Sequence, residues 1–199
     1  MKEHVKIKMD EYGEKHRFWT DQAIGQFGQA TNLFFIINAG FLAYLTSSDK
    51  MRSAFEINFQ GNFSISNLLF MMSILLSLLS VIFSGFTVLS RLHDLRLTRH
   101  TIWIRRKSYR KWEKDFPDNH KTLPMKSFVK EVKCFANTLL NKKYFIVDED
   151  IENWENLEIK FEKLRERNLL LGRFSWRCLN YQIVFLILSF SFFIASHWA

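Results

Sequence analysis

Three apolar segments that contain no charged residue constrain the fold of this 199-residue chain more than any other feature. They cover residues 30–46, 67–90 and 179–196, and each is long enough to cross a bilayer as a helix, the first only just. The chain contains two prolines and seven glycines, which favours long uninterrupted helices. The sequence therefore predicts an all-α membrane protein with three transmembrane helices.

The distribution of Lys and Arg predicts how these helices are oriented. Residues 1–29 contain five basic residues, the connector 47–66 contains two, and residues 91–178 contain 21. Because cytoplasmic segments of membrane proteins are enriched in Lys and Arg, we expect the N-terminal segment and residues 91–178 in the cytoplasm. The connector, where a short strand is one possibility, and the C-terminal end would lie outside.

A helical cytoplasmic region is expected between the second and third spans. No proline occurs from residue 67 to 114, so the second span would continue into the cytoplasm as one helix of about 48 residues and end at 116–119. Two amphipathic helices would follow, over residues 124–143 and 148–171, the second ending near Gly172. These helices could pack with the long one as a small bundle.

A row of polar side chains, the polar seam, follows one face of the second span and continues beyond it. Its spacing alternates between four and three residues, which keeps the side chains on one face of a helix. Two interpretations stay open: the face packs closely against another helix, or several copies turn it inward and line a hydrated path whose cytoplasmic mouth is acidic and basic. The seam consists of Ser73, Ser77, Ser80, Ser84, Thr87, Arg91, Asp94 and Thr98, and then of Thr101 and Arg105.

Small and polar residues also gather on one face of the first span. Small residues let helices approach closely, and amides bond between helices, so this face is expected to meet another span. Asn38 is a further amide that lies off this face. The candidate packing residues are Gly25, Gln29, Asn32, Ala39 and Ala43.

A basic and aromatic stretch, WIRRKSYRKWEK, covers residues 103–114. Three interpretations stay open: a solvated or bundle-packed face, a contact with anionic lipid, or a contact with nucleic acid or a nucleoprotein. The candidate contact residues are Arg105, Arg106, Lys107, Arg110 and Lys111.

Motifs of known catalytic chemistry do not occur in the chain. It has no Gly-rich phosphate loop, no GxSxG, no HExxH and no cysteine–histidine spacing typical of zinc sites. We therefore expect neither an enzyme nor a cofactor, a metal or a small-molecule substrate. Cys134 and Cys178 both fall in the cytoplasmic region, where a disulfide is not expected.

The segment SRLHDLRLTRH at residues 90–100 resembles a pattern in small bacterial membrane proteins encoded in antiphage defence loci. The first span, NLFFIINAGFLAYL, is similar to theirs too, so the resemblance covers residues 15–110. SLATT-type effectors and the transmembrane effectors of retrons have two close N-terminal spans and then a cytoplasmic helical region. The third span of this chain departs from that plan, and the membrane subunit of the Kiwa system is another defence protein of this size class.

The resemblance implies a toxic effector of the bacterial inner membrane that a partner complex holds silent. On infection the effector would be released and would permeabilise the membrane in contact with lipid, as a homo-oligomer, because one chain has too few helices for a pore. For a retron the silencing partner would be a reverse transcriptase with its nucleic acid. Two alternatives remain: a membrane-anchored sensor or scaffold of a defence complex, and a small channel component unrelated to defence.

Overall fold

A computed structural model describes residues 3–22, 25, 28–47, 65–116, 127–140 and 146–198. Among these residues every regular element is helical and no strand occurs, so the predicted all-α class is confirmed. The possible strand in the connector 47–66 lies almost wholly outside the described residues.

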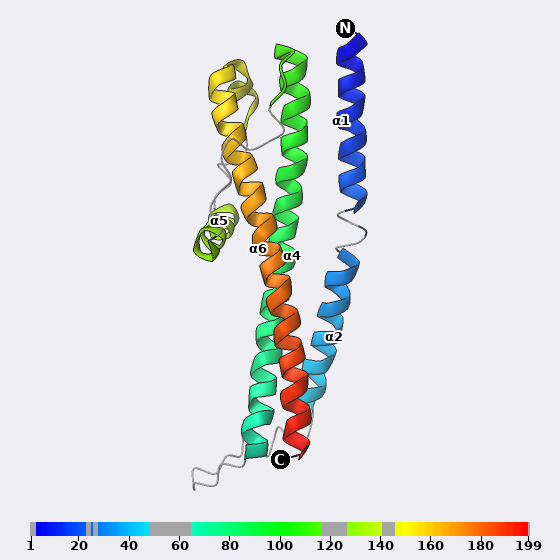
Figure 1. The fold of residues 1–199 in the computed structure, drawn as a ribbon, viewed down its shortest axis with the longest axis vertical. Helices are drawn as coiled ribbons and strands as arrows, with labels where there is room; N and C mark the ends of the chain where they lie inside the picture. Colours follow the sequence, from blue (N-terminus) through cyan, green and yellow to red (C-terminus); the bar gives the residue numbers. More distant parts are fainter. Residues whose placement is uncertain are drawn as a thin grey trace. The chain divides into compact units, whose positions relative to one another are not determined.

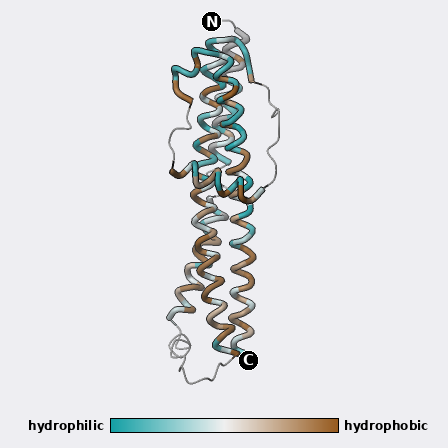
Figure 2. Tube along the Cα trace, turned by 90° about the vertical axis from the view of Figure 1, so that its left-hand side faces the viewer, coloured by the Kyte–Doolittle hydropathy of each residue, from teal (hydrophilic) through white to brown (hydrophobic). Residues whose placement is uncertain are grey.

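The chain divides into two compact units. The basic unit consists of Met1–Phe27 and Leu89–Ser175, and the apolar unit consists of Gly28–Val88 and Trp176–Ala199. Figure 2 shows the difference in character: the helices of the apolar unit are mostly hydrophobic, and those of the basic unit are mostly hydrophilic.

Helix α4 (Ile65–Trp112) has 48 residues, which confirms the predicted long helix. It ends slightly earlier than the predicted stop at 116–119. Glu113 takes a left-handed conformation with φ 51°, and its N–H donates to the carbonyl of Tyr109 at 2.9 Å. Phe116 then folds back and stacks on Phe161, with ring centroids 3.8 Å apart. The helix therefore ends where the stacking of Phe116 on Phe161 requires the chain to leave the helical path.

Helix α6 (Trp154–Trp198) has 45 residues and runs through Gly172 without a break. The predicted stop at this glycine is therefore wrong. No proline lies within the helix, and one interior glycine costs a helix only about 1 kcal/mol. Before α6, a short 3-10 helix, η2 (Asp148–Glu152), replaces the first turn of the predicted helix 148–171, and the Asn153 side chain accepts from the N–H of Glu155 at 3.0 Å.

In the apolar unit, α2 (Gly28–Ser47) packs with the first part of α4 and the last part of α6 (Figure 1). Aromatic contacts contribute much of this packing, such as Phe41 stacked on Phe190 at 3.9 Å. Two helices, α4 and α6, are long and apolar enough to cross a membrane, whereas α2 contributes a shorter apolar stretch, Thr31–Ser47. The hydrophobic core of the unit consists of Phe41, Leu45, Phe70, Ile74 and Leu186.

In the basic unit, Tyr12 of α1 (Glu3–Gln22) donates a hydrogen bond to Asp115, which lies just beyond the end of α4. The Trp112 indole donates to the carbonyl of Ile151 at 3.0 Å and so ties the end of α4 to η2. Helix α5 (Phe128–Leu140) lies within the predicted helix 124–143; residue 127 is not helical, and residues 124–126 and 141–143 lie outside the described part.

The orientation of α5 differs from the expected small bundle. Figure 1 looks almost along the axis of α5 while α6 runs vertically, and Figure 2, turned by 90°, draws α5 lying across it. Phe135 of α5 contacts Phe174 of α6, with ring centroids 4.8 Å apart. A bundle of three aligned helices is therefore not what this unit forms.

Candidate functional site

In the apolar unit the hydroxyl part of the polar seam is completely buried within the chain. Ser73, Ser77, Ser80, Ser84 and Thr87 each have 0% of their surface exposed. This face of α4 therefore packs against other helices of the same chain.

The contact between α4 and α6 repeats every seven residues. Ser73 donates to the carbonyl of Ser189 at 2.8 Å, and Ser189 donates back to the carbonyl of Ser73 at 2.6 Å. Seven residues further along α4, Ser80 donates to the carbonyl of Gln182 at 2.8 Å, seven residues earlier on α6. The two helices are thus antiparallel in a heptad register, with small residues that allow close approach.

Helix α2 joins this contact through the fully buried Asn38. Its amide nitrogen donates to Ser80 Oγ at 2.5 Å, and its oxygen accepts from Ser77 at 3.1 Å. The side chain of Gln182 is also fully buried, and neither of its polar atoms has a hydrogen-bond partner in the part of the chain that the structure describes. We call Asn38, Ser77, Ser80 and Gln182 the amide cluster, because the hydroxyls of α4 bond there to the amide of Asn38 and to the backbone carbonyl of Gln182.

The packing face of α2 differs from the one expected from its small residues. Gln29, Asn32 and Ala43 are exposed, and Gly25 and Ala39 are half-buried. The buried face is the neighbouring one, and it contains Thr31, Asn38, Phe41 and Leu45. The expected face is thereby corrected: large side chains that fill the core and one bonded amide determine the rotation of α2 here.

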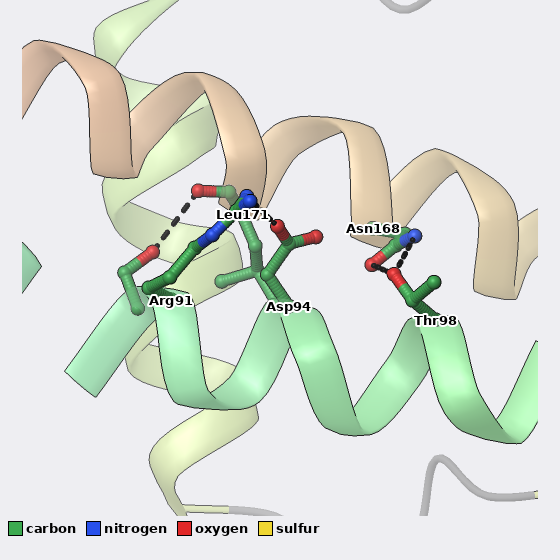
Figure 3. Close-up of polar contacts among 6 residues, drawn as sticks. Arg91, Asp94, Thr98, Asn168 and Leu171 are labelled. Carbon is green, nitrogen blue, oxygen red and sulfur yellow. Dashed lines mark hydrogen bonds and ion pairs between the residues drawn. The ribbon is translucent and has the colours of Figure 1, made fainter. Parts of the chain in front are cut away.

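The seam residues of the basic unit form a charged cluster (Figure 3). Arg91 Nη1 lies 2.7 Å from Asp94 Oδ2, and Asp94 is only 7% exposed. One residue before Arg91, Ser90 donates to the carbonyl of Leu171 at 3.0 Å, so the α4–α6 contact also surrounds this ion pair. The sequence had placed both charges on one helix face, and the structure brings them into direct contact.

Asn168 of α6 completes the surroundings of Asp94. Its amide satisfies all its neighbours when the nitrogen faces Asp94: the nitrogen then donates to Oδ1 at 2.6 Å, and the oxygen accepts from Thr98 at 2.9 Å. Figure 3 draws the opposite amide orientation, with both hydrogen bonds to Thr98. A Cβ added at Gly172 would lie 3.7 Å from Asp94 Oδ2, so α6 passes close to the carboxylate.

The environment shifts the pKa of the titratable groups near this cluster. Burial raises the pKa of Asp94 to about 6, although Arg91 opposes the shift. Burial and, secondly, Arg96 lower the pKa of His93. Burial also lowers the pKa of His100, which accepts from the N–H of Ile146 at 3.1 Å. Burial of Asp94 thus favours the protonated form of its carboxyl group.

Part of the basic stretch is used inside the basic unit. Arg105 lies over the ring of Phe161 at 5.7 Å, and Lys107 pairs with Asp148. The other three candidates, Arg106, Arg110 and Lys111, are exposed, and Lys111 also lies over the ring of Trp112. The stretch therefore splits into cations that pack and cations that face outward.

The structure adds site residues that the sequence analysis did not select: Ser189, Gln182 and Asn168 of α6. They contact α4 at the same face that the predicted seam occupies. A seven-residue step back from Ser189 reaches Gln182, so the heptad spacing of polar residues along α6 was the signal available in the sequence. Among the described residues, no group of three or more His, Cys, Asp or Glu side chains is placed to hold a metal ion.

No protein-family model matches the chain, and neither a curated protein nor a solved structure is similar to it. The class that the fold and the site define is an all-helical protein with two long apolar helices joined by a polar contact.

Proposed function

We propose that the chain is a multi-pass effector of the bacterial inner membrane that permeabilises the bilayer when a silencing partner releases it, as part of an antiviral defence system. In this proposal the structure is the closed form of the effector. The observation that carries it is the complete burial of the hydroxyl face of α4 within one chain. A hydrophilic surface stored in this way becomes available to line a path only when α4 and α6 separate.

Exposed apolar surface supports membrane insertion. Only 39% of the most apolar window of α4 and 28% of that of α6 is buried, whereas the core helix of a soluble protein would be mostly buried. Leu75 and Leu78 of α4, together with Val184 and Ile187 of α6, point outward and would contact lipid. We propose that α2 is the third span and that the charge distribution holds the N-terminal segment and residues 91–178 in the cytoplasm.

Oligomerisation and a partner complete the proposal. Three spans cannot enclose a pore, so the open form would be a homo-oligomer whose α4 faces turn inward. The exposed cations Arg106, Arg110 and Lys111 would bind the silencing partner, and the phosphates of a reverse transcriptase–nucleic acid complex fit their charge. The resemblance of residues 90–100 to defence effectors supplies this biological setting.

Expression without the partner tests the function. Induced in a bacterium that lacks the partner, the chain should depolarise the inner membrane and arrest growth, as read by a potential-sensitive dye. A variant with Arg106, Arg110 and Lys111 changed to Glu should still depolarise the membrane, but the partner should no longer protect the cells. Intact membrane potential at a confirmed level of membrane-inserted protein, also during phage challenge, would refute the proposal.

A specific observation favours a second candidate, a membrane-anchored sensor or scaffold. Ser73, Ser77 and Ser80 all make hydrogen bonds within the chain, which suits a permanent packing face. In that case the spans only hold the basic unit at the membrane, and another protein kills the cell. A chain that never depolarises membranes but is required for protection would support this candidate.

A further inference from the structure

Helix α5 exposes most of its large apolar side chains and buries an acidic one. Val129 is 74% exposed and Leu140 is 82% exposed, whereas Glu131 is 0% exposed. Phe128, Val132 and Leu139 are exposed as well. A helix of a soluble unit normally has the opposite arrangement, so the outward face of α5 is suited to an apolar environment.

The exposed residues form one continuous sector of the helix. Phe128, Val132 and Leu139 follow each other at helical spacing, and at 100° per residue Val129 and Leu140 lie on the same side. The exposed cations Lys130 and Lys133 lie beside this sector. An apolar sector flanked by lysines is the pattern of helices that lie in the headgroup region of a membrane.

Helix α5 packs on α6 shortly before the apolar stretch of α6 begins. Phe135 contacts Phe174 of α6, and Cys134 donates from Sγ to the carbonyl of Arg167 at 4.0 Å. Phe174 lies five residues before Leu179, where the apolar stretch of α6 begins, which is about 7 Å of helix rise. Within the basic unit, α5 lies across the first part of α6 (Figures 1 and 2).

We propose that α5 is an interfacial helix whose apolar sector inserts into the cytoplasmic leaflet, with Lys130 and Lys133 bound to anionic lipid headgroups. This inference rests on the proposed membrane insertion of α6. The charge of the flank selects lipid as the occupant, because a second copy of the same face would bring like charges together. The helix then fixes the height of the basic unit above the bilayer.

Spin labels on the full-length chain test the depth of α5. In a background with Cys134→Ser and Cys178→Ser, a nitroxide would be attached at Val129→Cys, and the chain reconstituted in vesicles of phosphatidylethanolamine and anionic phosphatidylglycerol. Collisions with oxygen, relative to those with a water-soluble nickel chelate, should place the label about 5–10 Å below the headgroups. Ile159→Cys is the matched control: it is an exposed aliphatic site of α6 in the basic unit, about 30 Å of helix rise before Leu179, and it should report water.

A third label separates the two proposals. Ile187→Cys lies on the exposed side of α6 in the apolar unit and should report lipid. If Ile187 reports water, the proposed function itself fails. If Ile187 reports lipid and Val129 reports water, only the interfacial helix is overturned.

Two further outcomes concern the identity of the occupant. The pair Lys130→Glu and Lys133→Glu should reduce the depth at residue 129 in anionic vesicles more than in neutral phosphatidylcholine, and equal depth in both would overturn the role of the lysines. A label at Val129 that both reagents fail to reach, with spin coupling between copies, would mean that a second copy covers the face and would overturn the proposal.

Discussion

Ser73 and Ser189 each donate a hydrogen bond to the backbone carbonyl of the other, at 2.8 and 2.6 Å. Their hydroxyl oxygens are 3.2 Å apart, so the two backbones approach as closely as small side chains allow. This reciprocal pair shows that the polar seam of α4 is one side of a helix–helix contact, and that α6 supplies the other side.

The reciprocal pair should contribute measurably to stability. Ser189→Ala removes the bond to the Ser73 carbonyl and one partner of Ser73, and should cost about 1 kcal/mol, or about 2–4 °C in Tm. Thermal unfolding in detergent measures the effect. Ser191→Ala is the matched control, since Ser191 is exposed and its hydroxyl donates to the carbonyl of Ile187 in its own helix; equal effects of the two variants would contradict the assigned contact.

The two asparagines of α2 should differ strongly in their contribution to stability. Asn38→Ala breaks the bonds to Ser77 and Ser80 in the buried amide cluster and should lower stability by about 1–2 kcal/mol. Asn32→Ala removes an exposed side chain and should change stability by less than about 0.5 kcal/mol. Thermal unfolding in detergent measures the loss of stability for each variant. A larger loss for Asn32→Ala would mean that the small-residue face of α2 is the packed one after all.

The charge of Asp94 should make stability depend on pH. Burial raises its pKa to about 6 from an ordinary value of 3.8, so the folded chain holds this proton more tightly than the unfolded chain. The stabilising contribution is complete below 3.8 and is lost as the pH rises through about 6, with a total on the order of 2–3 kcal/mol.

Asp94→Asn isolates this contribution. Burial lowers the pKa of His93 and His100, and these groups destabilise the fold as the pH falls below 6.5, which is the opposite direction. The measured quantity is therefore the difference in Tm between the natural chain and the variant from pH 4 to pH 7.5. As the pH rises, the Tm of the natural chain should fall relative to that of the variant. A difference that stays constant over this pH range would show that Asp94 does not titrate there.

Gly172 should tolerate a methyl group. Its added Cβ would lie 3.7 Å from Asp94 Oδ2, an ordinary contact distance, and alanine stabilises a helix interior by up to about 1 kcal/mol over glycine. Gly172→Ala should thus unfold at an equal or higher temperature, whereas Gly172→Leu should unfold lower because its branched side chain meets the carboxylate. A loss of stability with alanine would show that the carboxylate needs the open space.

The sequence predicted the length of α4 and the existence of a polar face on it, because the absence of proline and the four–three spacing are local properties of one segment. It did not predict what this face contacts. Periodicity distinguishes one side of a helix from another, but the partners Ser189 and Gln182 lie about a hundred residues away along the chain.

Two differences have a common physical reason. On α2 the small residues suggested a contact face, yet the core volume of Phe41 and Leu45 and the bonds of Asn38 determined the rotation. On α6 the glycine suggested a stop, yet contacts with α4 such as the bond from Ser90 to the carbonyl of Leu171 outweigh a propensity cost of about 1 kcal/mol. In both places tertiary contacts overrode a local preference. The direction in which α5 lies has no local signal in the sequence at all.

We propose that the resting effector keeps α4 and α6 in contact and that their separation opens the membrane. A disulfide between Ser73→Cys and Ser189→Cys, in the background with Cys134→Ser and Cys178→Ser, would lock the contact. Ser73→Cys with Ser191→Cys is the control pair, since Ser191 is exposed and its hydroxyl donates to a carbonyl of its own helix.

Dye release from vesicles that contain the purified chain is the direct measurement. We predict that oxidation with copper phenanthroline abolishes release for the 73–189 pair, that reduction restores it, and that the 73–191 pair releases dye under both conditions. Undiminished release from the chain with a complete 73–189 disulfide would contradict the account, because the hydroxyl face would then have no part in opening the membrane.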